Sequence, residues 1–249
     1  MPVIYASNTG NSDDVYLYTV LESSWSNARD ATTADGGSDG TSAYANMTFV
    51  YHVINARSGS AIYGVTRSFF VFDTSGITGT VASAELSFRG VFGNDGSVIA
   101  VKSDAYGGDP NDVLDNWSTS DFNNIVGWSA GSSLDGLATV YGAAKTTTNW
   151  STSGWNDFTA TSDLLTDMKN NDAVIVCLMD YTNDYLNVAP SSGSQLNCGG
   201  YYAEASSYKP HIDYTLATGY GNEVNGIAGA SINEINGIAA SNVSKINGI

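Results

Sequence analysis

One stretch, residues 65–77, constrains the fold most because it is apolar on both of its faces. Its sequence, VTRSFFVFDTSGI, is rich in β-branched and aromatic residues and ends in an Asp-Thr-Ser-Gly turn signal. Alternate residues of a strand point to opposite faces, and the middle of this stretch is apolar on both. The pattern predicts a core strand that is covered on both faces, as in a sheet packed on another sheet.

Arg67 lies within this apolar stretch, on the face that also carries Val65, Phe69 and Val71. A buried guanidinium needs a charged partner, and Asp73 or another carboxylate could supply it. We therefore expect a structural ion pair between Arg67 and Asp73. An arginine that binds a ligand is the less favoured alternative.

The composition favours an all-β protein. The chain has 249 residues, which allows one large β domain or two small ones, and 42% of them are hydrophobic, enough for a core. The formal net charge of −16, with only 9 Lys and Arg, argues against a nucleic-acid surface. The acidic surface is compatible with divalent cations, but no ligand spacing indicates a site, so we expect no metal and no cofactor.

Apolar patterns predict a series of further strands along the chain. They fall at residues 15–21, 47–54, 84–91, 98–102, 137–141, 155–161, 173–179, 201–204 and 211–216. Residues 30–45 are expected to form a polar loop broken by glycines, and residues 104–137 a long irregular insert. One short helix is expected at 164–169, capped by Ser162 or Asp163.

Several tryptophans are candidates for contact with a glycan or a partner protein. Aromatic rings stack on sugars and on neighbouring subunits, although they more often attach a long loop to the core. The candidates are Trp117, Trp128, Trp150 and Trp155.

No catalytic motif is recognisable. A Ser-His-Asp site would have to use His52 or His211, and neither lies beside a recognisable nucleophile. Most aspartates lie in Gly-, Asn- and Ser-rich loops, where turn capping is the usual role. Cys177 and Cys198 are expected to be free thiols, with a disulfide as the alternative. We expect no enzymatic activity.

The chain shows no pattern of a secretory signal peptide and no apolar run near the ~20 residues that a membrane span requires. We therefore expect a protein that is made in a cytoplasm and does not enter a membrane.

The composition changes after residue 217, which divides the chain into a predicted sandwich domain (1–217) and a tail (218–249). In the tail, Ile-Asn-Gly-Ile recurs at an eleven-residue spacing at 235–238 and 246–249, after a first copy, Val-Asn-Gly-Ile, at 224–227. Asn-Gly is a strong turn signal, so we expect short β segments joined by tight turns rather than a helix.

The tail is too short to bury its own β-branched residues, so we expect it to pack on another copy, on another protein or on its own domain. A flexible tail is less favoured because disordered tails are normally apolar-poor. The residues expected to mediate oligomerisation or docking are Val224, Ile227, Ile232, Ile235, Ile238, Val243, Ile246 and Ile249.

Ordered motifs between residues 14 and 216 resemble the DNRLRE-type β-sandwich family. They are R-S-F-F-V-F-D-T-S-G-I at 67–77, V-A-S-A-E-L-S-F at 81–88, W-N-D-F-T-A-T at 155–161, Y-A-E at 202–204 and K-P-H-I-D-Y at 209–214. The resemblance implies a jelly-roll-like antiparallel sandwich of the kind found in cell-surface, carbohydrate-binding and virion proteins. It implies no enzyme.

Two further segments resemble parts of phage proteins. W-S-N-A-R-D-A-T-T at 25–33 is similar to an opening seen in proteins of marine phage genomes, and the I-N-G-I repeats are similar to the ends of proteins encoded by tailed phages. Together they imply a non-catalytic virion protein, such as a capsid decoration, head fibre or tail appendage. It would be made in the host cytoplasm and assemble through its tail with itself, a trimer being one arrangement, and with other virion proteins.

Two alternatives stay open. The first is a carbohydrate-binding module that recognises a host surface glycan, and the second is a subunit of an extracellular filament.

Overall fold

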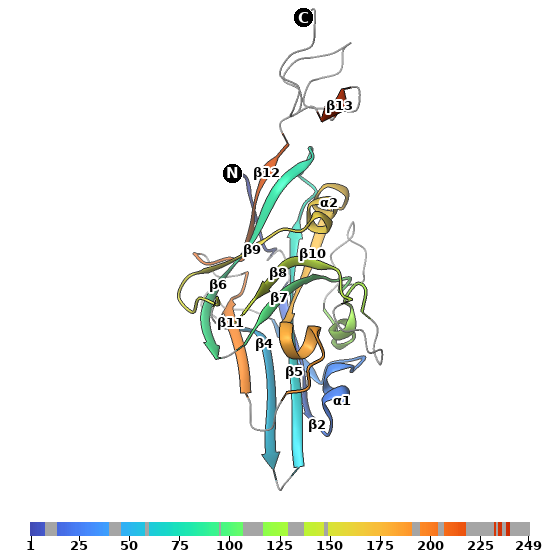
Figure 1. Cartoon of the computed structure of the whole chain (residues 1–249), viewed down its shortest axis with the longest axis vertical. Helices are drawn as coiled ribbons and strands as arrows, with labels where there is room; N and C mark the ends of the chain where they lie inside the picture. The colour runs from blue at the N-terminus through green and yellow to red at the C-terminus, as the bar shows by residue number, and fades with distance from the viewer. Residues whose placement is uncertain are drawn as a thin grey trace, which may run out of the picture.

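The protein is described by a computed structural model (Figure 1). It describes residues 1–7, 14–39, 46–57, 60–94, 96–106, 117–128, 137–146, 149–190, 195–203, 207–217, 232, 234–235 and 238–239.

The strands before the tail are β1 (Val3–Tyr5), β2 (Asp14–Glu22), β3 (Gly36–Asp39), β4 (Asn46–Arg57), β5 (Ser60–Asp73), β6 (Val81–Asn94), β7 (Val98–Lys102), β8 (Val140–Lys145), β9 (Trp155–Thr159), β10 (Ala173–Asp180), β11 (Gln195–Tyr201) and β12 (His211–Leu216). The helical segments are α1 (Trp25–Arg29), the 3₁₀ turn η1 (Thr119–Asn123), α2 (Ser162–Asn170) and the π-helical turn η2 (Tyr181–Tyr185).

Among the described residues before the tail, all strand pairs are antiparallel, and they form two sheets that share β6. The first sheet has the order β1-β12-β6-β9. In the second sheet, β5 pairs with β2 along one edge, and along its other edge it pairs first with β4 and then with β10. The first half of β6 lies in the first sheet, and from Gly90 onward β6 pairs with β11 of the second. The prediction of an all-β antiparallel sandwich is confirmed.

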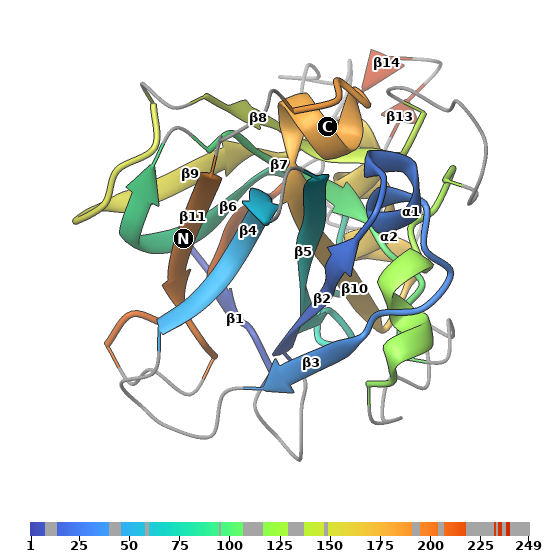
Figure 2. The same cartoon turned by 90° about the horizontal axis from the view of Figure 1, so that it is seen from below.

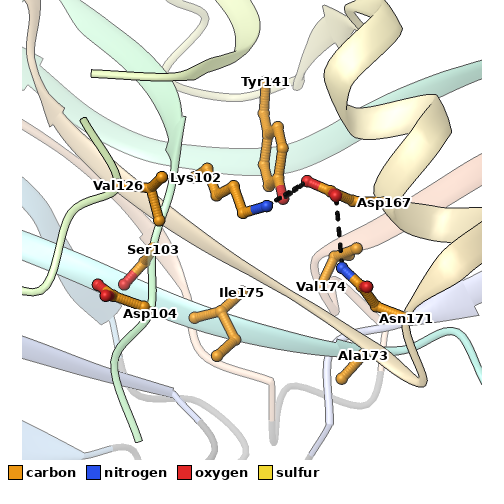
Figure 3. Close-up of a pocket in the computed structure, with 10 residues that line it drawn as sticks. All are labelled: Lys102, Ser103, Asp104, Val126, Tyr141, Asp167, Asn171, Ala173, Val174 and Ile175. Carbon is orange, nitrogen blue, oxygen red and sulfur yellow. Dashed lines mark hydrogen bonds and ion pairs between the residues drawn. The ribbon is translucent and has the colours of Figure 1, made fainter. Parts of the chain in front are cut away.

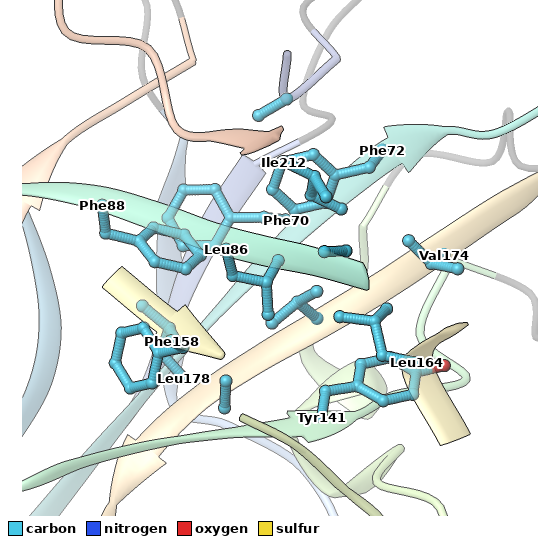
Figure 4. Close-up of a cluster of buried hydrophobic side chains, with 14 of the residues drawn as sticks. Phe70, Phe72, Leu86, Phe88, Tyr141, Phe158, Leu164, Val174, Leu178 and Ile212 are labelled. Atoms are coloured by element: carbon cyan, nitrogen blue, oxygen red, sulfur yellow. The ribbon is translucent and has the colours of Figure 1, made fainter. Parts of the chain in front are cut away.

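A first apolar core fills the space between the two sheets (Figure 4). Phe70 and Phe72 of β5 enter it from one side, and Leu86 and Phe88 of β6 enter it from the other. The rings of Phe70 and Phe88 lie 5.1 Å apart between centroids. Helix α2 closes one end of this core with Leu164 and another buried side chain, Met168.

A second core lies on the opposite face of the same strands. Phe69 and Val71 of β5 point into it, so β5 is covered on both faces, as its sequence predicts. The cover on this side is not another sheet, however. It consists of α1, η1, η2 and the segment around Trp128, whose side chains pack against β2, β5 and β10.

Strand β3 corrects the expectation of a loop broken by glycines. Strand β3 lies beside β2 (Figure 2), and its Gly36 and Gly37 pair with Tyr18 and Leu17. A Cβ atom on Gly36 would lie 2.6 Å from the Tyr18 hydroxyl, and one on Gly37 would lie 2.5 Å from Leu17 Cδ2. The glycines therefore support the strand here, because their missing side chains leave room for large cross-strand neighbours to lie over them.

The helices also differ from expectation. Helix α2 begins one residue after Thr161, which is its N-cap in place of Ser162 or Asp163. Helix α1 was not predicted from the sequence. It is short and is held by its N-cap Ser24, whose hydroxyl accepts from the Asn27 backbone N–H, and by the burial of Trp25 in the second core.

In the tail, β13 (Glu234–Ile235) and β14 (Ile238–Ala239) form an antiparallel pair. Ile235 pairs with Ile238 across Asn236-Gly237, the register that an Asn-Gly turn predicts. The other two repeat copies lie outside the described residues.

Candidate functional sites

The buried arginine of β5 pairs with a carboxylate from a distant part of the chain. Arg67 is fully buried, and its Nε and Nη2 atoms each donate to Asp184 at 2.7 Å. Burial by itself would lower the pKa of Arg67, but the adjacent Asp184 carboxylate outweighs it and raises that pKa. The predicted ion pair between Arg67 and Asp73 is wrong. Asp73 is exposed, and it accepts hydrogen bonds from the backbone N–H and the hydroxyl of Ser75.

A second buried arginine completes this charge centre. Arg29 of α1 donates from Nε to the backbone carbonyl of Asp184 at 2.7 Å and pairs with Asp30 at 2.8 Å. Its guanidinium lies 4.1 Å from the centroid of the Trp128 ring, and that of Arg67 lies 4.3 Å from the Phe122 ring. The charges balance and the arginines are stacked and hydrogen-bonded, which favours a structural role.

The candidate tryptophans do not come together in one site. Trp128 is buried on the arginine pair, and Trp150 is buried in the first core with its indole N–H donating to the Phe92 carbonyl at 3.1 Å. Trp117 packs partly buried against the second core. Trp155 alone among the four lies on the outer face of the first sheet, where it is half-buried.

A shallow hollow of about 430 Å³ lies beside Trp155. Tyr5, Ser207, Lys209 and His211 complete its lining. The Trp155 and His211 rings meet edge to face, with centroids 4.6 Å apart, and Tyr5 lies on the other side of His211 at 5.8 Å. Lys209, Tyr5 and His211 could not be assigned to a site from sequence, because only strand register brings them beside Trp155.

A second cavity of about 320 Å³ lies between α2 and the strands β7, β8 and β10 (Figure 3). Asp167 of α2 pairs with Lys102 at 2.8 Å and accepts from the Tyr141 hydroxyl at 2.6 Å, and the Asn171 amide donates to it at 3.4 Å. Burial and the Asp167 carboxylate raise the pKa of Tyr141. The tyrosine thus stays a protonated donor and the lysine stays ion-paired, an arrangement that attaches α2 to the sheet.

The remaining sequence candidates are placed as follows. Cys177 and Cys198 are both buried free thiols in different cores, and burial raises the pKa of each. Within the described ranges, no group of three or more His, Cys, Asp or Glu residues could hold a metal ion. No helix in the described part of the chain is long and apolar enough to span a membrane.

The tail residues are described only in part. Ile238 is 53% exposed, Ile232 is half-buried, and Ile235 pairs with Ile238. The other expected docking residues lie outside the described residues: Val224, Ile227, Val243, Ile246 and Ile249.

No family model matches this chain, and no curated protein sequence matches it either. The resemblance to DNRLRE-type domains and to phage proteins therefore stays a prediction.

Proposed function

We propose that this protein is a non-catalytic structural component of a tailed-phage virion, a capsid decoration, head fibre or tail appendage that assembles through residues 218–249. The proposal combines the sandwich fold with the phage-like repeats. The observation that carries it is the β13–β14 hairpin, which presents an exposed Ile238 and pairs with no other described strand.

A hairpin this short is not stable by itself in water. The sandwich has two cores of its own, both already filled by its own elements. An apolar sequence repeated along the tail is best stabilised by packing on tails of other copies or on another virion protein. The net charge of −16 keeps the acidic bodies apart, so it favours contact through the tail.

The double substitution Ile235→Asp and Ile238→Asp tests this proposal. It leaves the Asn-Gly sequence unchanged but replaces one apolar residue in each strand of one repeat by a charge, so we expect the assembly to dissociate in sedimentation velocity. Val188→Asp is the matched control, because Val188 is a body residue with 50% exposure. If the double variant sediments like the native protein, the tail is not the assembly element.

Carbohydrate binding is the second candidate function, and a specific observation favours it. Trp155 lies on an open sheet face beside an exposed tyrosine and several polar groups. The two functions are compatible, since a fibre can both assemble and bind a host glycan. The filament alternative has no such observation in its support.

A further inference from the structure

We infer that the outer face of the first sheet binds a neutral sugar ring in the hollow beside Trp155. This inference rests on the second candidate function and names its site and its ligand class.

Strand register places the site on the sheet face that points away from the core. Leu86, Phe88 and Ile212 alternate inward into the first core, so their neighbours along β6 and β12 face outward. Tyr5 pairs with His211, and His211 pairs with Ser87 of β6. Trp155 pairs with the next outward residue of β6 and extends over that strand to the His211 ring. Three rings from three strands thus form one row across the sheet.

The ring geometry suits a small ring-shaped ligand. The Trp155 and His211 planes meet at 81°, and those of Tyr5 and His211 at 52°, so the row is a hollow and not a flat platform. Tyr5 is 57% exposed. The volume of about 430 Å³ lies within the range of small-molecule sites, about 300–1,000 Å³. An aromatic ring offers the apolar face of a sugar a large contact at little cost in side-chain entropy.

The polar groups at the rim indicate an uncharged ligand. Lys209 and the Ser207 hydroxyl, which line the hollow, supply donors. Asp213 is not part of the lining but contacts His211, and it supplies an acceptor next to the hollow. The Nδ1 atom of His211 lies 3.1 Å from the Lys209 carbonyl oxygen and its Nε2 atom 3.4 Å from the Asp213 carboxylate. A neutral imidazole donates to one of these two acceptors, which orients the ring before a ligand binds. Sugar hydroxyls need both donors and acceptors, which this rim provides. An anionic glycan would gain Lys209 but would meet Asp213 and a chain of net charge −16.

Affinity electrophoresis of the full chain tests the site. The native gels contain dextran, mannan or galactomannan as neutral probes, and hyaluronan as the anionic probe. We expect retardation by at least one neutral polysaccharide and none by hyaluronan. Trp155→Ala and Tyr5→Ala should each weaken the retained interaction by about tenfold, the loss expected for one stacking aromatic. Trp155→Phe should weaken the interaction less than Trp155→Ala, because it keeps an aromatic ring at this position.

Leu137→Ala is the matched control, because Leu137 is also 57% exposed but does not line the hollow. It should migrate as the native protein does. If Trp155→Ala fails to fold, as judged by circular dichroism, Tyr5→Ala decides the test.

The outcomes separate the site from the function. Retardation that both alanine variants retain would overturn the site but leave carbohydrate binding in place. No retardation by any neutral probe, or retardation by hyaluronan alone, would overturn the inference and count against the second function. The assembly experiment does not depend on either result, because it changes only tail residues.

Discussion

At the scale of residues, the buried charge centre determines how the irregular side of the molecule is organised. Arg67 donates to Asp184 and also to the backbone carbonyls of Phe122 at 2.9 Å and Arg29 at 2.8 Å. It therefore connects η2, η1 and α1 to β5 through one guanidinium group. Such buried pairs add little net stability as pairs, but they fix the geometry of the segments that supply the partners.

Removal of the Asp184 carboxylate should destabilise the folded protein. Asp184→Asn leaves the buried Arg67 facing a neutral amide, while Arg29 keeps Asp30, so we expect a loss of about 3–5 kcal/mol in the free energy of unfolding. Asp73→Asn is the control and should change it by no more than about 0.5 kcal/mol, because the exposed side chain can still accept from Ser75. Urea denaturation measures both. Equal effects of the two substitutions would show that Asp184 is not the essential partner.

The buried carboxyl group of Asp180 predicts that the stability of the fold depends on pH. Asp180 is at the end of β10, and burial raises its pKa to about 6 despite hydrogen bonds from Asn183 and Ser97 that lower it. Folded Asp180 thus keeps its proton up to about pH 6, while the unfolded chain loses it near pH 4. The stability from this group is present below about pH 4 and is lost as the pH rises through about 6.

The Asp180→Asn variant cannot ionise at this position. Between about pH 4 and pH 7 its stability should therefore rise by about 3 kcal/mol relative to the native protein. Denaturation curves at a series of pH values measure this difference. Parallel pH profiles for the two proteins would contradict the assignment.

At the scale of elements, β6 is the strand that makes the sandwich, because it passes from one sheet to the other at Gly90. A Cβ atom there would lie 1.9 Å from the Ser151 carbonyl oxygen and 2.8 Å from the Asn156 amide nitrogen. The Gly90 backbone N–H also donates to the Gly154 carbonyl at 3.0 Å. Only glycine lets the segment before β9 approach β6 this closely.

Gly90→Ala should therefore destabilise the fold by about 1–3 kcal/mol, the usual cost of an overpacked site. Gly76→Ala is the matched control, since nothing lies within 4 Å of a Cβ atom at Gly76. The control should leave the stability unchanged or raise it by up to about 1 kcal/mol through a less flexible unfolded chain. Thermal unfolding of both variants measures the difference in stability. A Gly90→Ala variant as stable as Gly76→Ala would contradict the prediction.

Sequence patterns predicted the long apolar strands well. The predicted strand at 98–102 coincides with β7, and the one at 173–179 lies within β10, because continuous apolar runs leave few alternatives to a buried strand. The short elements were missed. Strand β3 depends on its neighbours in β2, and α1 depends on the burial of Trp25, so neither has a periodic signal of its own.

Contacts between distant residues could not be predicted either. Asp184 is 117 residues from Arg67, and its position after β10 becomes relevant only once β10 pairs with β5. The sequence identified Trp155 as a candidate, but it could not identify the residues that lie beside it in the hollow, because strand pairing brings them together. Trp150 donates a hydrogen bond to β6, and Trp128 stacks on Arg29, so neither is available at the surface. Both interactions follow from tertiary packing and could not be predicted from the sequence.

The whole molecule consists of an acidic sandwich body followed by a tail with an apolar repeat. The body has two filled cores, and its first and last strands, β1 and β12, lie side by side. Its net charge opposes close contact between bodies. The described strand pair of the tail has an exposed apolar residue, Ile238. This division predicts that assembly depends on the tail and that folding does not.

The most direct test is the solution mass, by light scattering, of the full chain and of a chain that lacks residues 222–249. We predict a multimer for the 26.1 kDa full chain and a folded monomer for the shortened one. A shortened chain that keeps the multimeric mass would contradict assembly through the tail. A full chain that is itself monomeric would contradict self-assembly and would leave the tail as a docking segment for a different protein.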